Sequence, residues 1–354
     1  MPLRSIKAHE KGGFSRLVIF LLIGFYIVAA AITLGVGAAD ISIANVVSTW
    51  NWQTPMTFNT RDEIILFNLR MPRLILGTIV GAALSVCGAV LQSLFRNPLA
   101  DPGIIGVTAG ASLGAVSMIV LGGSVLSIVV QYLGVFALPL SAFLGALLIT
   151  WFIQKIATSN GKTSIITMLL AGIALQAFAM ALTGILIFLA DDQQLRDLTF
   201  WGLGSVAGAT WMKCFITGAI VLLVYCFLPK LADALNALSL GEANAFHMGI
   251  NVQRAKNIAI VCTAAATGAA VSVSGGIGFI GIIVPHLLRL IIGPDNRYLL
   301  PASALLGAIV LITADAVART IVAPAELPIG IITALIGAPF FLWLLLQKRG
   351  LLLE

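Results

Sequence analysis

Residues 74–95, LILGTIVGAALSVCGAVLQSLF, decide the fold class of this chain. The segment has no charged side chain, and a helix needs about 20 apolar residues to cross the hydrocarbon core of a bilayer. Similar uncharged runs cover residues 17–39, 103–154, 163–190, 257–288 and 327–347. The sequence therefore predicts an all-α polytopic membrane protein.

We expect about ten transmembrane helices. The 103–154 run is long enough for two crossings, with a turn at residues 122–124, and the 257–288 run contains a similar break. Two further spans cover about 213–229 and 299–320. An even number of spans would place both termini on the same side of the membrane.

The composition excludes an ordinary soluble enzyme. Of the 354 residues, 60% are apolar and 10% are charged, against roughly 25% charged in an average soluble domain. The mean hydropathy is +1.07, so too few polar side chains exist to cover a water-facing surface. The net charge of +6 does not indicate a nucleic-acid partner, because the Lys and Arg residues lie in short loops between apolar runs.

The distribution of Lys and Arg predicts the orientation. Cytoplasmic loops carry an excess of these residues. With the N-terminus inside, most of the 20 Lys and Arg residues fall on the cytoplasmic side, so both termini are expected there. The exceptions, expected outside, are Arg61, Arg70, Arg73, Arg196, Lys213 and Arg319.

The four cysteines are Cys87, Cys214, Cys226 and Cys262. They lie in or beside apolar segments without CxxC spacing, so we interpret them as small buried side chains rather than disulfides or metal ligands. No metal site is predicted in this chain.

One expected cytoplasmic connection, residues 231–256, is unusually long: LADALNALSLGEANAFHMGINVQRAK. Its apolar residues recur at helical spacing, so we expect short helices that lie on the membrane face. A connection of this length suggests contact with a cytoplasmic partner.

A candidate internal repeat relates GAALSVCG at 81–88 to GAAVSVSG at 268–275, which agree at six of eight positions. Gly and Ala are abundant in this chain, so a chance match stays open. A real repeat would relate helices 2–5 to helices 7–10 in opposite orientations, an arrangement common in transporters.

The stretch LRMPRLILGTIVGAALSVCGAVLQSLFRNPLADPGIIGVTAGASLGAV at 69–116 resembles the FecCD-type permeases. These are the membrane subunits of binding-protein-dependent ABC importers for ferric siderophores, haem and cobalamin. Two further blocks resemble the same family: GGIGFIGIIVPHLLRLIIGPDNRYLLPASALLGAIVLITADAVAR at 275–319 and AELPIGIITALIGAPFFLWLL at 325–345. The resemblance implies a single transmembrane permease domain over residues 1–354, in the bacterial cytoplasmic (inner) membrane.

The resemblance also implies partners. It implies a homodimer with the translocation path at its interface, two cytoplasmic ATPase subunits, and a periplasmic or extracellular substrate-binding protein. ATP and Mg²⁺ would bind the ATPase, because this chain has no GxxxxGK(S/T) phosphate loop. We therefore expect the chain to be a transport subunit rather than an enzyme, with no cofactor of its own and with membrane lipid around it.

In the 231–256 segment, Gly241, Glu242, Ala245 and Gly249 match the GE…A…G pattern of the family's ATPase-coupling loop. Small side chains at Ala245 and Gly249 would let a short helix seat in a groove of the partner. Glu242 could cap or pair at the start of that helix. The alternative is a solvated amphipathic loop without a partner.

The family's outward-facing arginines correspond to Arg70, Arg73 and Arg319, which would pair with carboxylates on the two lobes of the binding protein. The alternative is pairing within the chain, since Asp315 and Arg319 are four residues apart on one helix.

In the RNPLADPG turn, Asn97 and Leu99 match positions that line the family's cytoplasmic gate. A purely structural turn is the alternative, because Pro98 and Pro102 would hold the chain extended there. A second gate strand is expected near residues 163–164.

The segments at 189–208 and 323–345 look closest to the haem-uptake members, so the expected cargo is haem, moved by alternating access. A ferric siderophore is the first alternative cargo, and cobalamin is the second. His286 is not expected to ligate haem. A secondary transporter without an ATPase is the alternative from another class, but such proteins place ionisable residues deep in their helices.

Overall fold

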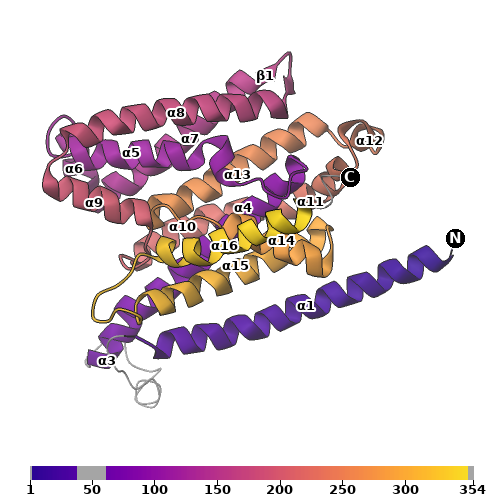
Figure 1. The fold of residues 1–354 in the computed structure, drawn as a ribbon, viewed down its shortest axis with the longest axis horizontal. Helices are drawn as coiled ribbons and strands as arrows, with labels where there is room; N and C mark the ends of the chain where they lie inside the picture. The colour runs from indigo at the N-terminus through magenta and orange to yellow at the C-terminus, as the bar shows by residue number, and fades with distance from the viewer. Residues whose placement is uncertain (1, 38–60, 350–354) are drawn as a thin grey trace.

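The computed structural model describes residues 2–37 and 61–349, and this part of the chain is almost entirely helical (Figure 1). A short antiparallel hairpin is formed by β1 (Thr158–Ser159) and β2 (Lys162–Thr163). The helices, in chain order, are α1 (Pro2–Gly35), α3 (Arg61–Ile64), η1 (Ile65–Arg70), α4 (Met71–Leu94), η2 (Pro102–Ile105), α5 (Val107–Leu121), α6 (Ser127–Leu133), η3 (Gly134–Phe136), α7 (Ala137–Ala157), α8 (Ile165–Leu189), α9 (Asp192–Leu203), α10 (Trp211–Tyr225), α11 (Leu228–Ser239), α12 (Glu242–His247), α13 (Val252–Ser274), α14 (Ile280–Ile292), α15 (Asn296–Ala318) and α16 (Ile329–Arg349).

The apolar helices correspond to the spans predicted from the sequence. Among the described residues, six helical segments are long and apolar enough to cross a membrane, and α10 with α11, bent by 51°, makes a seventh. Three shorter apolar helices lie in α5, α14 and the first part of α16. The prediction of an all-α polytopic membrane protein is confirmed.

Helix α4 lies at the centre of the bundle, against α15, α13 and α14. Glycines allow this close approach. A Cβ atom at Gly81 would collide with the carbonyl oxygen of Gly307 on α15, and one at Gly88 with the carbonyl oxygen of Gly281 on α14. Backbones thus pack directly on backbones, as small residues permit between membrane helices.

The helix pairings are those that the candidate repeat requires. In the candidate repeat, α4 corresponds to α13 and α7 corresponds to α15. The contact between α4 and α15 in the structure would then correspond to the contact between α13 and α7. Both pairs are extensively packed in the structure.

The two ends of the bundle carry different elements (Figure 1). The hairpin, α12, the start of α1 and the end of α16 lie at one end, which we call the α12 end. The short helices α3, α6 and α9 lie at the opposite end, which we call the η1 end because η1 follows α3 directly. The described chain therefore begins and ends on the same side of the bundle.

The 231–256 segment is largely helical, as expected, and much of it packs against the helices of the bundle. Helix α11 packs one face against α15, α4 and α13, and Leu235 on that face is fully buried. The segment also contains the first turn of α13, so only α12 and its flanking turns protrude. An amphipathic pattern predicts a buried stripe without saying what covers it.

The cysteines differ from the expectation at one position. Cys87, Cys214 and Cys262 are buried, whereas Cys226 is exposed at the C-cap of α10. Cys226 lies at the bend between α10 and α11.

Candidate functional site

At the η1 end, Arg73 lies between two carboxylates. Its Nε atom is 2.9 Å from both carboxylate oxygens of Asp315, and its Nη2 atom is 2.8 Å from Oδ1. Its Nη1 atom donates to Glu326 Oε1 at 2.8 Å. The side chains of Arg73 and Asp315 are 11% and 7% exposed, whereas that of Glu326 is 42% exposed. Such a forked, nearly dry pair is the strong form of an Arg–carboxylate contact.

Arg70 and Arg319 hold the C-terminal end of α1. Arg70 donates from Nη1 to the carbonyl oxygens of Leu34, at 2.5 Å, and Gly35, at 2.9 Å, and Arg319 donates to the carbonyl oxygen of Thr33. The last carbonyls of a helix have no partner within it, and cations there also offset the negative end of the helix dipole. Burial lowers the pKa of Arg319, and Asp315 opposes that shift.

The structure thus brings the three predicted docking arginines into one cluster with Asp315 and Glu326. Arg70 and Arg319 are buried, at 5% and 6% exposure, and the Asp315–Arg319 contact expected from their spacing is 3.8 Å long. Intrachain pairing therefore does occur. A docking role for the arginines stays a prediction.

Helix α12 is bounded by two glycines in conformations that other residues rarely adopt. Gly241 precedes it with φ +110°, and Gly249 follows it with φ +83°. The amide of Ile250 donates to the carbonyl of Ala245 at 3.0 Å across Gly249, which forms a Schellman C-cap. Gly241 and Gly249 thus fix the ends of α12 sharply.

The side chains of α12 are arranged differently from the sequence interpretation. Ala245 is fully buried against the chain's own body, so it seats α12 on the permease rather than in a partner's groove. The exposed side chains are Phe246, Met248 and, just before the helix, Leu240, at 71%, 61% and 62%. Glu242 pairs with Lys256 on α13, Oε1 to Nζ, at 2.8 Å and makes no side-chain cap.

The predicted gate turn follows α4 directly. Asn97 is exposed, and its Oδ1 atom accepts from the amide of Leu99 at 2.9 Å, which forms a tight turn. The preceding residue, Arg96, has φ +50°. The last turns of α4 connect this region to α14, because the Gln92 side chain donates to the carbonyl of Ile282 at 3.1 Å.

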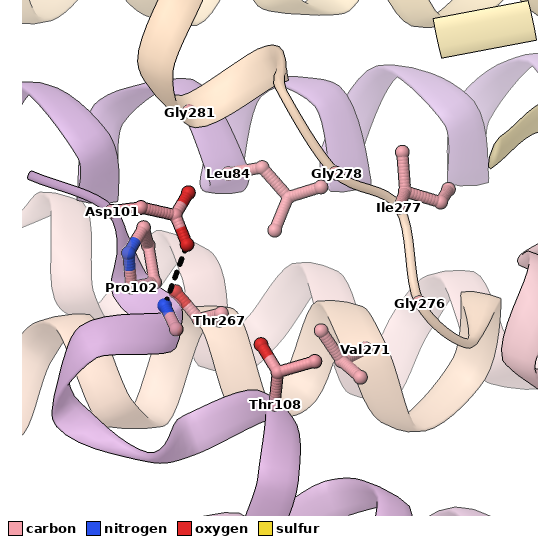
Figure 2. A pocket seen from close by; sticks show the side chains of 11 residues that line it. Leu84, Asp101, Pro102, Thr108, Thr267, Val271, Gly276, Ile277, Gly278 and Gly281 are labelled. Atoms are coloured by element: carbon pink, nitrogen blue, oxygen red, sulfur yellow. Dashed lines mark hydrogen bonds between the residues drawn. The ribbon is translucent and has the colours of Figure 1, made fainter. Parts of the chain in front are cut away.

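Beyond the turn, a cavity of about 290 Å³ lies between η2 and the non-helical link from α13 to α14 (Figure 2). The extended segment from Gly276 to Gly278 borders it on the side opposite Asp101. The Asp101 side chain caps η2 by accepting from the amide of Gly103 at 2.7 Å. Burial raises the pKa of Asp101, while that hydrogen bond opposes the shift.

Two residues of these sites were missed from the sequence. Asp101 lies in the RNPLADPG turn that follows α4, and a carboxylate directly before a proline in such a turn is a detectable signal. The sequence predicts Lys256 only as one of the cytoplasmic charges, and no local pattern shows that it is buried. His286, which was not expected to ligate haem, is buried in α14. Among the described residues, no group of three or more His, Cys, Asp or Glu side chains is arranged to hold a metal ion.

Comparisons with known proteins agree on one family. The model of the FecCD transport family matches residues 23–347. The hemin transport system permease protein of Yersinia pestis is 42% identical over 332 residues, covering 93% of this chain and 96% of that protein. The cobalamin import system permease protein of Halobacterium salinarum is 42% identical over 306 residues, covering 84% and 78%. A solved inward-facing structure of a metal-chelate type ABC transporter superposes with a TM-score of 0.78 at 32% identity, covering 94% of this chain and 99% of that one.

Proposed function

Because this chain belongs to the FecCD transport family, we propose that it is the membrane-spanning permease of an ABC importer that moves haem into the cytoplasm by alternating access. The observation that carries the cargo is the 42% identity to a hemin permease over 93% of the chain. The alternative cargoes are a ferric siderophore and cobalamin. Cobalamin is the cargo named for a relative of equal identity but smaller coverage.

We assign the ATPase contact to α12. Leu240, Phe246 and Met248 are large apolar side chains that protrude together at one end of the bundle. An exposed apolar cluster rimmed by polar residues is typical of a protein interface. Gly241 and Gly249 hold these side chains in place by fixing the helix ends. Two copies of the permease would then recruit two ATPase subunits, which bind ATP and Mg²⁺.

A homodimer is proposed to enclose the translocation path. Helix α8 is long and apolar, yet only 22% of its most apolar window is buried within the protomer. The exposed side chains include Ile166, Leu170 and Ile173. Lipid covers some of this surface, and the second permease subunit is proposed to cover the rest.

The arginine cluster is proposed to form the docking surface for the binding protein. Glu326 is its most exposed member, and Arg73 lies directly beside it. Arg70 and Arg319 lie beneath and fix the end of α1 next to this surface. An incoming carboxylate would compete with Glu326 for Arg73, so we expect docking to depend on salt.

The turn at Asn97 and Leu99 is proposed to form part of the cytoplasmic gate. It follows the buried helix α4 and is held by hydrogen bonds, among them the one from the Leu99 amide to Asn97 Oδ1, and Asn97 itself is exposed. Such a turn can rearrange at lower cost than the core below it.

Uptake by the reconstituted complex tests the function. The permease, its ATPase and its binding protein are placed in proteoliposomes, and ATP-dependent uptake of hemin, a ferric siderophore and cobalamin is compared. We expect hemin uptake that requires ATP hydrolysis. Uptake of only cobalamin or only the siderophore would overturn the cargo. Uptake by the permease alone, driven by an ion gradient, would overturn the ABC importer assignment.

A further inference from the structure

One buried ammonium group connects α12 to the hairpin that precedes α8. Lys256, in the second turn of α13, is 5% exposed. Its Nζ atom is 2.8 Å from Glu242 Oε1 on α12 and donates to the backbone carbonyl of Thr163 on β2 at 2.9 Å. These two contacts come from two different segments, α12 and β2.

The strand that Lys256 holds is fixed at several atoms. Gln253, one turn earlier on α13, accepts from the amide of Thr163 at 2.9 Å and donates to its hydroxyl at 2.5 Å. The Thr163 hydroxyl also contacts that of Thr158 on β1, at 2.8 Å. Thr163 itself is 4% exposed. The start of α13 therefore determines where β2 lies.

This strand leads directly into a long membrane helix. Ser164 follows Thr163 and is the N-cap of α8, with its side chain accepting from the amide of Thr167. A displacement of β2 would therefore move the first turn of α8. Glu242, at the other side of Lys256, is 45% exposed and is the first residue of α12.

The physics favours joint movement of these parts. A buried ammonium needs hydrogen-bonded or charged partners, because leaving it without them costs far more than one exposed ion pair contributes. Lys256 therefore cannot leave either Glu242 or Thr163 without a replacement. A movement of α12 would therefore be transmitted to the Thr163 carbonyl through the Lys256 side chain.

We propose that Lys256 is a positioning residue that couples movement of α12 to β2 and the start of α8. The proposal rests on the proposed role of α12 as the ATPase contact. The Lys256 ammonium forms an ion pair with Glu242 on α12 and donates a hydrogen bond to the backbone carbonyl of Thr163 on β2. Lysine can serve both at once, since its ammonium has three donors.

The test measures coupling and geometry in the assembled complex. Lys256→Met keeps the length and the buried stem but loses both polar contacts, and Lys256→Arg keeps a cation with donors. Asp233→Asn is the matched control, because it removes another ion pair, Asp233 Oδ1 to Arg297 Nε at 2.6 Å, that does not touch the hairpin. The first readout is the number of ATP molecules hydrolysed per cargo molecule transported.

The second readout is a distance between spin labels on Ser159 of β1 and Ala243 of α12, both exposed, after exchange of the exposed Cys226 for serine. In the wild type we expect one narrow distance that is the same without nucleotide and with trapped ATP. In Lys256→Met we expect a broadened distance that changes with nucleotide. We also expect ATP use per cargo to rise about twofold to thirtyfold, the range given by typical coupling energies. Lys256→Arg should restore part of both.

Two failures are distinguishable. If the wild-type permease does not co-purify with an ATPase, the proposed function fails first. If the complex assembles but Lys256→Met keeps the narrow distance and the wild-type ATP use, Lys256 is not a coupling residue. Should Lys256→Met not fold, Glu242→Met keeps the length of the side chain but removes the acceptor oxygens at the exposed end of the contact. A wild-type distance and wild-type ATP use in that variant would also overturn the proposal.

Discussion

Replacing Arg73 with methionine would leave Asp315 buried without its forked partner. Breaking a buried ion pair by removing one member costs about 3–5 kcal/mol. Arg319 Nε remains 3.8 Å from Asp315, which recovers part of the lost attraction, so we expect a loss near the lower end, about 3 kcal/mol. The lost contact with Glu326 adds little, because that carboxylate is 42% exposed and exposed pairs contribute about 0–1 kcal/mol.

A double-mutant cycle checks the pair. The free energy of unfolding is measured in detergent for the wild type, Arg73→Met, Asp315→Asn and the double variant. Because the double variant removes both members of the Arg73–Asp315 pair, its loss should be smaller than the sum of the single losses by about 2 kcal/mol. Additivity within about 0.5 kcal/mol would refute the reasoning and show that the two residues do not act as a pair.

A fourth variant separates docking from folding. Glu326→Gln removes the carboxylate that competes for Arg73 but leaves the buried pair with Asp315 intact. Stability should change by less than about 1 kcal/mol. If Arg73 receives a carboxylate of the binding protein, the dissociation constant should fall and its dependence on salt should increase. An unchanged dissociation constant would assign Arg73 to the fold alone.

Three further outcomes are expected. Gly88→Ala should destabilise the fold by about 1–3 kcal/mol, because the added Cβ would meet the carbonyl of Gly281. Gly184→Ala is the control, because the space around Gly184 on α8 is open. Equal melting temperatures of the two variants would contradict this packing. Phe246→Ser should weaken ATPase co-purification by about tenfold without lowering permease stability, and unchanged recruitment would exclude α12 as the contact. A maleimide should label Cys226 well before the three buried cysteines, as peptide mass spectrometry would show, and equal labelling would contradict their burial.

The helices were predictable because bilayer thickness imposes a length on uncharged runs. The 74–95 run corresponds to α4, and the expected turn at 122–124 falls directly after α5. The break expected within 257–288 is the link between α13 and α14. In each case the signal lies within one short window of sequence.

The contacts of the candidate sites were not predictable in the same way. Arg73 and Asp315 are 242 positions apart, so no local pattern pairs them. Likewise, α11 has the pattern of a surface helix, yet α15, α4 and α13 cover its apolar face. The side chain of Ala245 points inward although its small size also suits a partner's groove. Which face of a short helix is covered depends on tertiary packing.

The attachment of α1 has a consequence for the biogenesis of the protein. Only 11% of its most apolar window is buried, so α1 can enter the membrane as an independent helix as soon as it is synthesised. Its main neighbour is α15. The carbonyl oxygen of Thr33 accepts a hydrogen bond from Arg319, which is synthesised 286 residues later. A nascent chain that stops before α15 would therefore hold α1 inserted but not yet docked. Completion of the arginine cluster, rather than insertion of the first helix, would mark the end of folding at the η1 end.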